Sequence, residues 1–240
     1  DDIANSWKET AKRYVDQQNE RARFNSEHFE SYADFRTGEL GDWKTAGQGL
    51  RQGPTNSGEF CVATDGEDAI NAVLPAGCFT HTLSPKLNGT LRSPVLRAGG
   101  KSLTFRVLGE HTSALRLVSN NCQLNYKNYR ALTGAAPEWV TFELPKELDS
   151  IRVYAELMTK FDNPKFPDQL GTLGGDNRND RVPWEEAAAD PRSYFGITQV
   201  VMHDDAETPR PDLDHVCRLF GVADTAHPQT QEDVAERYAA

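Results

Sequence analysis

The chain has 240 residues, of which 38% are hydrophobic, and it carries a formal net charge of −10. No apolar stretch approaches the roughly 20 residues that a membrane-spanning helix needs, so we expect no membrane span. The acidic balance argues against nucleic acid as a partner, because binding to phosphate usually requires a basic face. Metal ions, cationic ligands and neutral sugars fit this charge better. The chain opens on Asp1-Asp2 without a signal-peptide pattern, as a processed protein or a piece of a longer one would.

The N-terminal flank, residues 1–30, is expected to be helical. Neither glycine nor proline occurs before Gly38. Apolar side chains recur with a helical period over residues 3–22 and fall near one face: Ile3, Trp7, Ala11, Tyr14, Val15 and Ala22. We therefore expect a helix over 3–22 that packs against the outside of the domain that follows.

After Gly38 the sequence changes to short strands separated by turns. Apolar and polar residues alternate in three stretches, 102–107, 139–144 and 151–157. A period of two indicates strands with one buried face and one solvated face. Further strand candidates lie at 59–63, 69–74, 78–83, 114–119 and 194–203. Many short strands between turn residues predict a mainly β domain over 31–205, an antiparallel two-sheet sandwich of the jelly-roll or lectin-like type.

Two segments depart from the strand pattern. Residues 161–193 are rich in proline and glycine and form the kind of long loop that often carries function. Pro209 and Pro211 mark a boundary, and residues 206–240 are expected to form a helical linker or the start of a next domain. The short helices expected there span 212–220 and 231–239.

The sequence contains no recognisable catalytic motif. A nucleophile elbow, a zinc-protease motif and a phosphate-binding loop are all absent. A glycoside hydrolase needs two carboxylates that face each other, and the candidates are Asp162, Asp168, Asp176, Asp180, Glu185 and Glu186. Because the chain has 36 acidic residues, any such pair is a weak indication, and an enzyme ranks third among the functions considered.

The four cysteines, Cys61, Cys78, Cys122 and Cys217, include no C-x-x-C pair. A zinc ribbon, a thioredoxin-type motif and a c-type haem attachment are therefore absent, and we expect no haem in this chain. Cys61 and Cys78 lie on neighbouring predicted strands. A disulfide between them and two small buried thiols are both consistent with the sequence.

Carboxylates in two places are candidate ligands for a structural calcium ion. Asp176 and Asp180 flank a loop of hard oxygen donors, although the spacing is not that of an EF-hand. Asp204 ends the last predicted strand, where a metal would tie the closing strand of a sandwich to the opening one. The alternative in each place is a solvated turn held by side-chain hydrogen bonds.

Sugar binding needs aromatic faces that stack on a pyranose, with amides and guanidinium groups that bond its hydroxyls. The segment 120–130 has this composition and follows a predicted strand. We place the candidate carbohydrate site at Arg92, Asn121, Gln123, Tyr126 and Tyr129, with the 161–193 loop as a wall. The alternative stacking surfaces are Trp43, Trp139 and Trp184. The alternative interpretation of the segment is an ordinary polar loop whose tyrosines pack on the sandwich.

Several strings between residues 30 and 220 are distinctive. They are Leu74-Pro75-Ala76-Gly77, Phe79-Thr80-His81-Thr82-Leu83-Ser84, Lys86-Leu87-Asn88-Gly89, Leu91-Arg92-Ser93-Pro94, Asn121-Cys122-Gln123-Leu124-Asn125-Tyr126, Tyr154-Ala155-Glu156-Leu157, Ser193-Tyr194-Phe195-Gly196 and His203-Asp204. This pattern resembles the middle region of large exported planctomycete proteins. Those proteins also carry a c-type cytochrome domain and flanking domains of unknown function, and their middle region is regarded as lectin-like or carbohydrate-binding.

The resemblance implies export, to the periplasm, the medium or the cell surface, and a glycan-related role without catalytic residues to carry over. Together with the residues themselves, it predicts a non-catalytic carbohydrate-binding module of a larger exported protein. The expected partners are a polysaccharide or other glycan and the neighbouring domains. The alternative is a structural domain that docks the flanking helical and cytochrome domains.

Overall fold

The computed structural model describes the chain apart from residues 1, 63–68, 98, 112, 123–127, 147, 149, 164–191, 205, 214–215, 218–219, 221–229 and 240. The chain divides into two compact units. One runs from Glu30 to Asp204, and the other combines the flanks Asp1–Phe29 and Asp205–Ala240. None of the described helices is long and apolar enough to cross a membrane.

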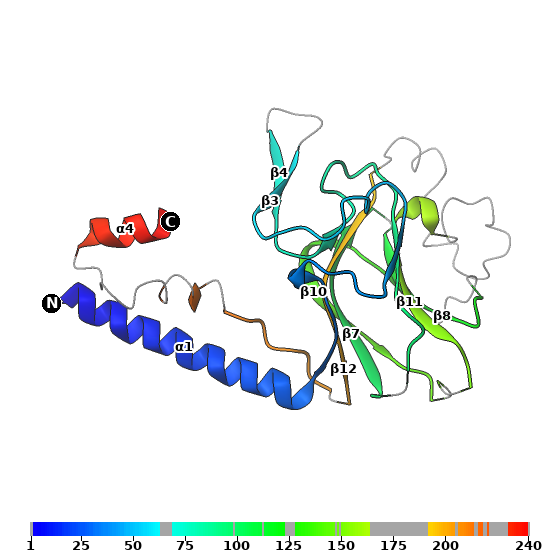
Figure 1. Cartoon of the computed structure of the whole chain (residues 1–240), viewed down its shortest axis with the longest axis horizontal. Coiled ribbons are helices and arrows are strands. Elements are labelled where there is room, and N and C mark those ends of the chain that lie inside the picture. The colour runs from blue at the N-terminus through cyan, green and yellow to red at the C-terminus, as the bar shows by residue number, and fades with distance from the viewer. Residues whose placement is uncertain are drawn as a thin grey trace. The chain divides into compact units, whose positions relative to one another are not determined.

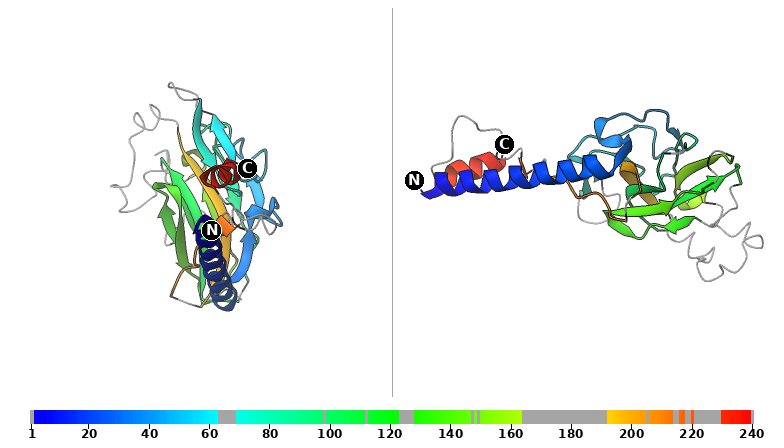
Figure 2. Two further views of the ribbon diagram at one scale, coloured as in Figure 1. Left: turned by 90° about the vertical axis from the view of Figure 1, so that its left-hand side faces the viewer. Right: turned by 90° about the horizontal axis from the view of Figure 1, so that it is seen from below.

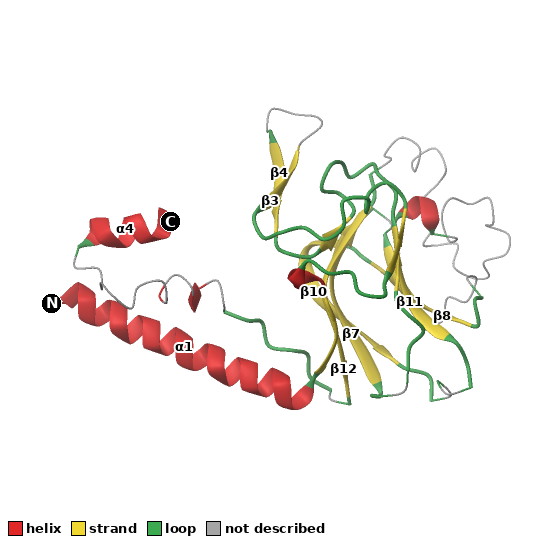
Figure 3. Cartoon of the chain, in the orientation of Figure 1, coloured by secondary structure: helices red, strands yellow, loops and turns green. Residues whose placement is uncertain are grey.

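The unit from Glu30 to Asp204, called the sandwich below, holds every strand that the structure describes (Figures 1 and 3). In chain order the strands are β1 (Glu30–Asp34), β2 (Lys44–Ala46), β3 (Glu59–Val62), β4 (Ile70–Leu74), β5 (Cys78–Phe79), β6 (Thr90–Arg92), β7 (Ser102–Glu110), β8 (Ala114–Ser119), β9 (Tyr129–Ala131), β10 (Gly134–Glu143), β11 (Val153–Met158) and β12 (Tyr194–His203). Two short 3-10 helices, η1 (Phe35–Thr37) and η2 (Lys160–Asp162), lie between them.

The strands form two five-stranded antiparallel sheets and one separate hairpin. Sheet A has the order β1-β12-β7-β10, with β5 also paired to β12. Sheet B has the order β2-β6-β11-β8-β9, and the hairpin pairs β3 with β4. The strands of the two sheets form two layers in the views of Figures 1 and 2.

A single large apolar core lies between the two sheets. It joins Phe105 and Ile197 of sheet A to Leu115 and Leu157 of sheet B, and all four side chains are fully buried. Along each strand these residues alternate with side chains that point to the outer face, as the pleat of a strand requires. The structure therefore confirms the predicted mainly β fold with an antiparallel two-sheet sandwich.

The β3–β4 hairpin adds a smaller apolar cluster on the outer face of sheet A. Cys61 and Leu74 of the hairpin contact Phe79 and Leu108 of the sheet there. Other apolar side chains of the hairpin are exposed: Phe60 (54%), Val62 (48%), Ile70 (50%) and Val73 (67%). The solvated face of an antiparallel pair is usually polar, so this exposed apolar face is unusual.

Cys61 and Cys78 are both buried and unbonded. Cys78 lies in the core between the sheets, whereas Cys61 lies under the hairpin, on the other face of sheet A. Burial raises the pKa of Cys78 to about 12 and also raises the pKa of Cys61. Of the two alternatives left by the sequence, the structure shows two buried thiols, which are inert near neutral pH.

The second unit is built on helix α1 (Asp2–His28), which continues past the predicted end at residue 22 because no glycine or proline interrupts it. Part of its apolar face is covered within the unit itself, whereas Val15 is exposed. The Trp7 ring lies 4.7 Å from that of Phe220, and the Asn25 amide exchanges two hydrogen bonds with the backbone of Arg210. The helix α4 (Gln231–Ala239) forms at the predicted place.

Candidate functional site

A row of charged and aromatic side chains crosses sheet B. Its members lie opposite one another on neighbouring strands, in the order Lys44, Arg92, Glu156, Arg116 and Tyr129. The residues adjacent in sequence, such as Leu91 and Leu157, belong to the core, so alternation directs the row to the opposite face of the sheet. Two residues of the predicted sugar site, Arg92 and Tyr129, are thus brought to one face.

The carboxylate of Glu156 links this row. It accepts hydrogen bonds from Nε of Arg92 at 2.6 Å and from Nε of Arg116 at 2.8 Å, and it also pairs with Nη2 of Arg116. The side chains of Glu156 and Arg116 are only 2% and 1% exposed, whereas that of Arg92 is 46% exposed. The centre of the row is therefore a buried ionic network that holds three strands together, and only its edge reaches solvent.

The structure describes only part of the rest of the predicted sugar site. The hydroxyl of Tyr129, which is half-buried, accepts a hydrogen bond from Nδ2 of Asn163 at 2.9 Å. Asn121 is exposed in a turn after β8, with a left-handed φ of 58°. Outside the described residues lie Gln123, Tyr126 and most of the 161–193 loop. The role of these residues in sugar binding stays a prediction.

The predicted calcium ligands are only partly described. Asp204 follows β12, and its Oδ1 accepts a hydrogen bond from the backbone N–H of Lys101, which precedes β7, at 2.7 Å. Asp176 and Asp180 lie outside the described residues. In the described part of the chain, no three histidine, cysteine or acidic side chains are grouped as metal ligands. The calcium site stays a prediction.

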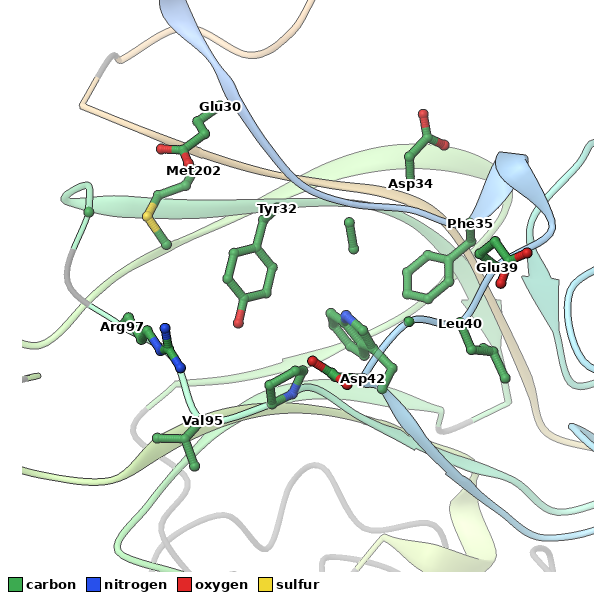
Figure 4. Close-up of a pocket in the computed structure, with 15 residues that line it drawn as sticks. Glu30, Tyr32, Asp34, Phe35, Glu39, Leu40, Asp42, Val95, Arg97 and Met202 are labelled. Carbon is green, nitrogen blue, oxygen red and sulfur yellow. The ribbon is translucent and has the colours of Figure 1, made fainter.

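A cleft of about 800 Å³ opens at β1, at the edge of sheet A. β1 and η1 line one side, and the other side is lined by residues 39–43 with Pro94, Val95, Arg97 and Gly99 (Figure 4). Gly38 and Gly41 have φ values of 83° and 56°, a left-handed conformation that glycine adopts without strain. These two turns carry residues 39–43 back across the cleft to face β1.

The cleft has an aromatic lining. The Trp43 ring stands perpendicular to that of Phe35, at 5.2 Å between centroids, and both are buried in the core. The Tyr32 ring contacts Trp43 edge to face at 6.5 Å, but it is only half-buried and points into the cleft (Figure 4). Tyr32 is therefore the aromatic ring that a ligand in the cleft can reach, and it packs on Trp43, one of the alternative stacking surfaces named from the sequence.

Polar groups of several kinds lie around the Tyr32 ring. Figure 4 places Arg97 and Asp42 on the side of the cleft toward which the ring points. Burial raises the pKa of Tyr32, against a lowering by the charge of Arg97, so the hydroxyl stays protonated and can both donate and accept. The cleft thus offers a guanidinium donor, a carboxylate acceptor and an amphoteric hydroxyl beside one aromatic face.

Asp34 is also in the cleft but is already paired. Its carboxylate accepts hydrogen bonds from Nε and Nη2 of Arg36 at 2.8 and 2.7 Å. Burial raises the pKa of Asp34, but the hydrogen bonds and charge of Arg36 outweigh burial and leave the pKa below its ordinary value. The charge of Asp34 is thus balanced within the fold.

Sequence reasoning missed Tyr32, Asp42 and Arg97. The β1 segment, Glu30 to Asp34, lacks the apolar alternation that identified other strands. The sequence therefore did not predict that its tyrosine lies in a strand that lines a cleft. A usable signal was the aromatic spacing around the turn glycines, which includes Trp43. Of the remaining tryptophans considered, Trp139 lies under the guanidinium of its cross-strand partner at 5.6 Å, and Trp184 is outside the described residues.

No protein-family model and no curated protein matches the chain. Two solved structures are similar to it. One is TmCBM61 in complex with β-1,4-galactotriose, with 13% identity, a TM-score of 0.36, and coverage of 73% of this chain and 99% of that chain. The other is the K1 cleaved adhesin domain of Lys-gingipain from Porphyromonas gingivalis W83, with 13% identity, a TM-score of 0.34, and coverage of 72% and 97%. At this identity and these TM-scores, the two structures carry no argument about the function of this chain.

Proposed function

We propose that the sandwich binds carbohydrate in the cleft at β1 and holds the glycan without cleaving it. One observation carries the proposal: the half-buried ring of Tyr32 faces a cleft of about 800 Å³ that also contains a guanidinium and a carboxylate. Ligand sites are typically concave, largely apolar and equipped with a few polar groups that fix orientation. This cleft is concave and places such polar groups beside the aromatic and aliphatic side chains of its lining.

Each part of the cleft matches a part of a sugar ring. The C–H face of a pyranose stacks on an aromatic ring, here Tyr32. Hydroxyl groups donate to a carboxylate and accept from a guanidinium, here Asp42 and Arg97. Because Phe35 and Trp43 are fixed in the core, the stacking ring is held in place before the ligand arrives, which lowers the entropic cost of binding.

Charge favours an uncharged or cationic glycan over an acidic one. Glu30, Glu39 and Asp42 line the cleft, and they make no ion pair with a described residue. Arg97 is the basic residue among the lining side chains that the structure describes. A carboxylate- or sulfate-bearing glycan would therefore meet a surface of its own sign, as it would over the whole chain with its net charge of −10.

We also propose that the sandwich is one module of a larger exported protein. The sequence resemblance supports a larger exported parent protein, with the sandwich in the periplasm, in the medium or on the cell surface. In that setting the module would keep the parent protein close to a polysaccharide.

Arg97→Ala is expected to weaken binding of a neutral oligosaccharide about tenfold, since a hydrogen bond to a charged group contributes about 1.5–3 kcal/mol and water replaces part of it. Isothermal calorimetry of the whole chain against a panel of neutral, amino and acidic oligosaccharides measures this. The matched control is Arg51→Ala, which removes another exposed arginine outside the cleft. Equal loss in both variants, or hydrolysis of the bound oligosaccharide, would contradict the proposal.

A second candidate function, docking against a neighbouring domain of the parent protein, is favoured by the exposed apolar face of the β3–β4 hairpin. Under this alternative no glycan of the panel binds. Val73→Lys then lowers the melting temperature of a longer parent chain, while that of the 240-residue chain is unchanged because Val73 is 67% exposed.

A further inference from the structure

A second pocket, of about 400 Å³, lies beneath the β3–β4 hairpin. It is distinct from the cleft at β1, with which it shares no lining residue. Its apolar walls include Val73 and Leu74 of the hairpin and Leu108 of the outer face of sheet A, with three proline rings. These prolines are Pro75, Pro85 and Pro137. A volume of this size suits a small ligand.

The polar lining of this pocket centres on His81. The residue is 5% exposed, and its Nδ1 atom has no hydrogen-bond partner among the described residues. A buried polar atom without a hydrogen-bond partner destabilises the folded state, so such an atom in a folded protein needs an explanation. Burial lowers the pKa of His81 to about 4, against a raising contribution from the backbone of Phe195, so the ring is neutral at physiological pH.

The side chains next to His81 contact one another, and they include both an acidic and a basic group. Its ring lies on that of Tyr194 at 4.2 Å, and the Tyr194 hydroxyl donates to Oε2 of Glu110 at 2.7 Å. Nε2 of His111 lies 3.9 Å from the same oxygen, and Arg192 also lines the pocket. Among its described lining residues, the pocket therefore combines one carboxylate, one guanidinium and a neutral imidazole with apolar walls, without a large excess of either charge.

We infer that this pocket binds a small neutral polyol, such as a single sugar ring. A hydroxyl group both donates and accepts, so it satisfies the unpaired nitrogen of His81 whichever ring nitrogen carries the proton. The remaining hydroxyls have Glu110 and Arg192 as acceptor and donor, and the C–H face of the ring has proline and leucine walls. An anion or a cation would gain less binding energy, because the described lining carries both an acidic side chain, Glu110, and a basic one, Arg192. This inference does not depend on the proposed function of the cleft.

The test is a titration followed through the imidazole signals of His81 in long-range ¹H–¹⁵N spectra, with glucose, galactose, mannose and glycerol as probes and acetate and ammonium as charged controls. At least one neutral probe is expected to shift the His81 signals saturably, at about 1 mM for a site worth about 4 kcal/mol. The blocking variant is Ala135→Trp, and its matched control is Ala136→Trp. Both alanines are exposed, but only Ala135 lines the pocket.

Ala135→Trp is expected to weaken the neutral probe at least about tenfold, and Ala136→Trp to leave it unchanged, where 1.4 kcal/mol corresponds to a factor of ten. Arg97→Ala, in the cleft, is expected to have no effect on the His81 signals. The inference is overturned if no neutral probe shifts these signals, if acetate or ammonium shifts them equally, or if Ala135→Trp binds as the parent does.

Discussion

Substitution of Glu156 by alanine is expected to lower the free energy of unfolding by about 3–5 kcal/mol. The carboxylate lies between the guanidinium groups of Arg92 and Arg116 and is 2% exposed. Without Glu156, the guanidinium group of Arg92 can be hydrated, because nearly half of its side chain is exposed. Arg116 is 1% exposed, so water cannot replace the lost carboxylate beside its guanidinium group. Urea denaturation of the variant and the parent measures the difference.

Two further variants separate the effect on stability of losing the charge pair from the effect of losing side-chain volume. Glu138→Ala removes an exposed glutamate from β10 and is expected to change stability by less than about 0.5 kcal/mol. The double variant Arg116→Met with Glu156→Leu replaces the buried pair by apolar side chains of similar size and is expected to recover most of the stability. A cost below about 1 kcal/mol for Glu156→Ala would show that the network is not what holds sheet B.

Stability is also expected to fall as the pH is lowered from about 6.5 to about 4, by about 3 kcal/mol from His81 alone. The pKa of His81 is depressed in the folded state, so between these values the unfolded chain binds a proton that the folded chain does not. The contribution is therefore fully present above pH 6.5 and lost as the pH approaches 4. The sign follows from burial, which disfavours the charged imidazolium.

The measurement is a difference between two chains, so that the contributions of all other side chains cancel. Two titratable side chains, Glu110 and His111, lie beside the Tyr194 ring that His81 contacts. His81→Gln is neutral at every pH, and subtracting its unfolding free energies from those of the parent isolates His81. A difference that stays constant between pH 4 and 6.5 would mean that His81 is charged as readily in the folded chain as in the unfolded one.

The strands of the core were predictable from the sequence because they carry their own pattern. β8 and β12 have the predicted bounds, and β7 begins where the alternation begins. β1, β2, β6 and β9 were not predicted, since each has three to five residues and pairs at or near a sheet edge, where burial imposes little pattern. The pairing of such strands can be identified only when the position of the partner strand in the folded sheet is known.

The candidate site was less predictable for the same reason. Tyr32 comes from one of these short edge strands. It meets Asp42 through the two glycine turns between them, and it meets Arg97 only through long-range folding of the chain. Composition did identify Arg92 and Tyr129, and the structure places them in one row of sheet B. It did not predict that the middle of this row, Arg116 and Glu156, is buried, because an ion pair across two strands leaves no local pattern.

The most direct test of carbohydrate binding in the cleft compares Tyr32→Ala with Tyr129→Ala by calorimetry, using a neutral oligosaccharide that binds the parent chain. A stacked aromatic ring contributes on the order of 1 kcal/mol beyond buried area, so Tyr32→Ala is expected to weaken binding about five- to tenfold or more. Tyr129→Ala removes a ring of the alternative site predicted from the sequence, and with the sugar bound in the cleft it is expected to leave the affinity unchanged. Melting curves verify that both variants remain folded. Loss of affinity in Tyr129→Ala with full affinity in Tyr32→Ala, or no binding of any glycan by the parent chain, would contradict the proposed site.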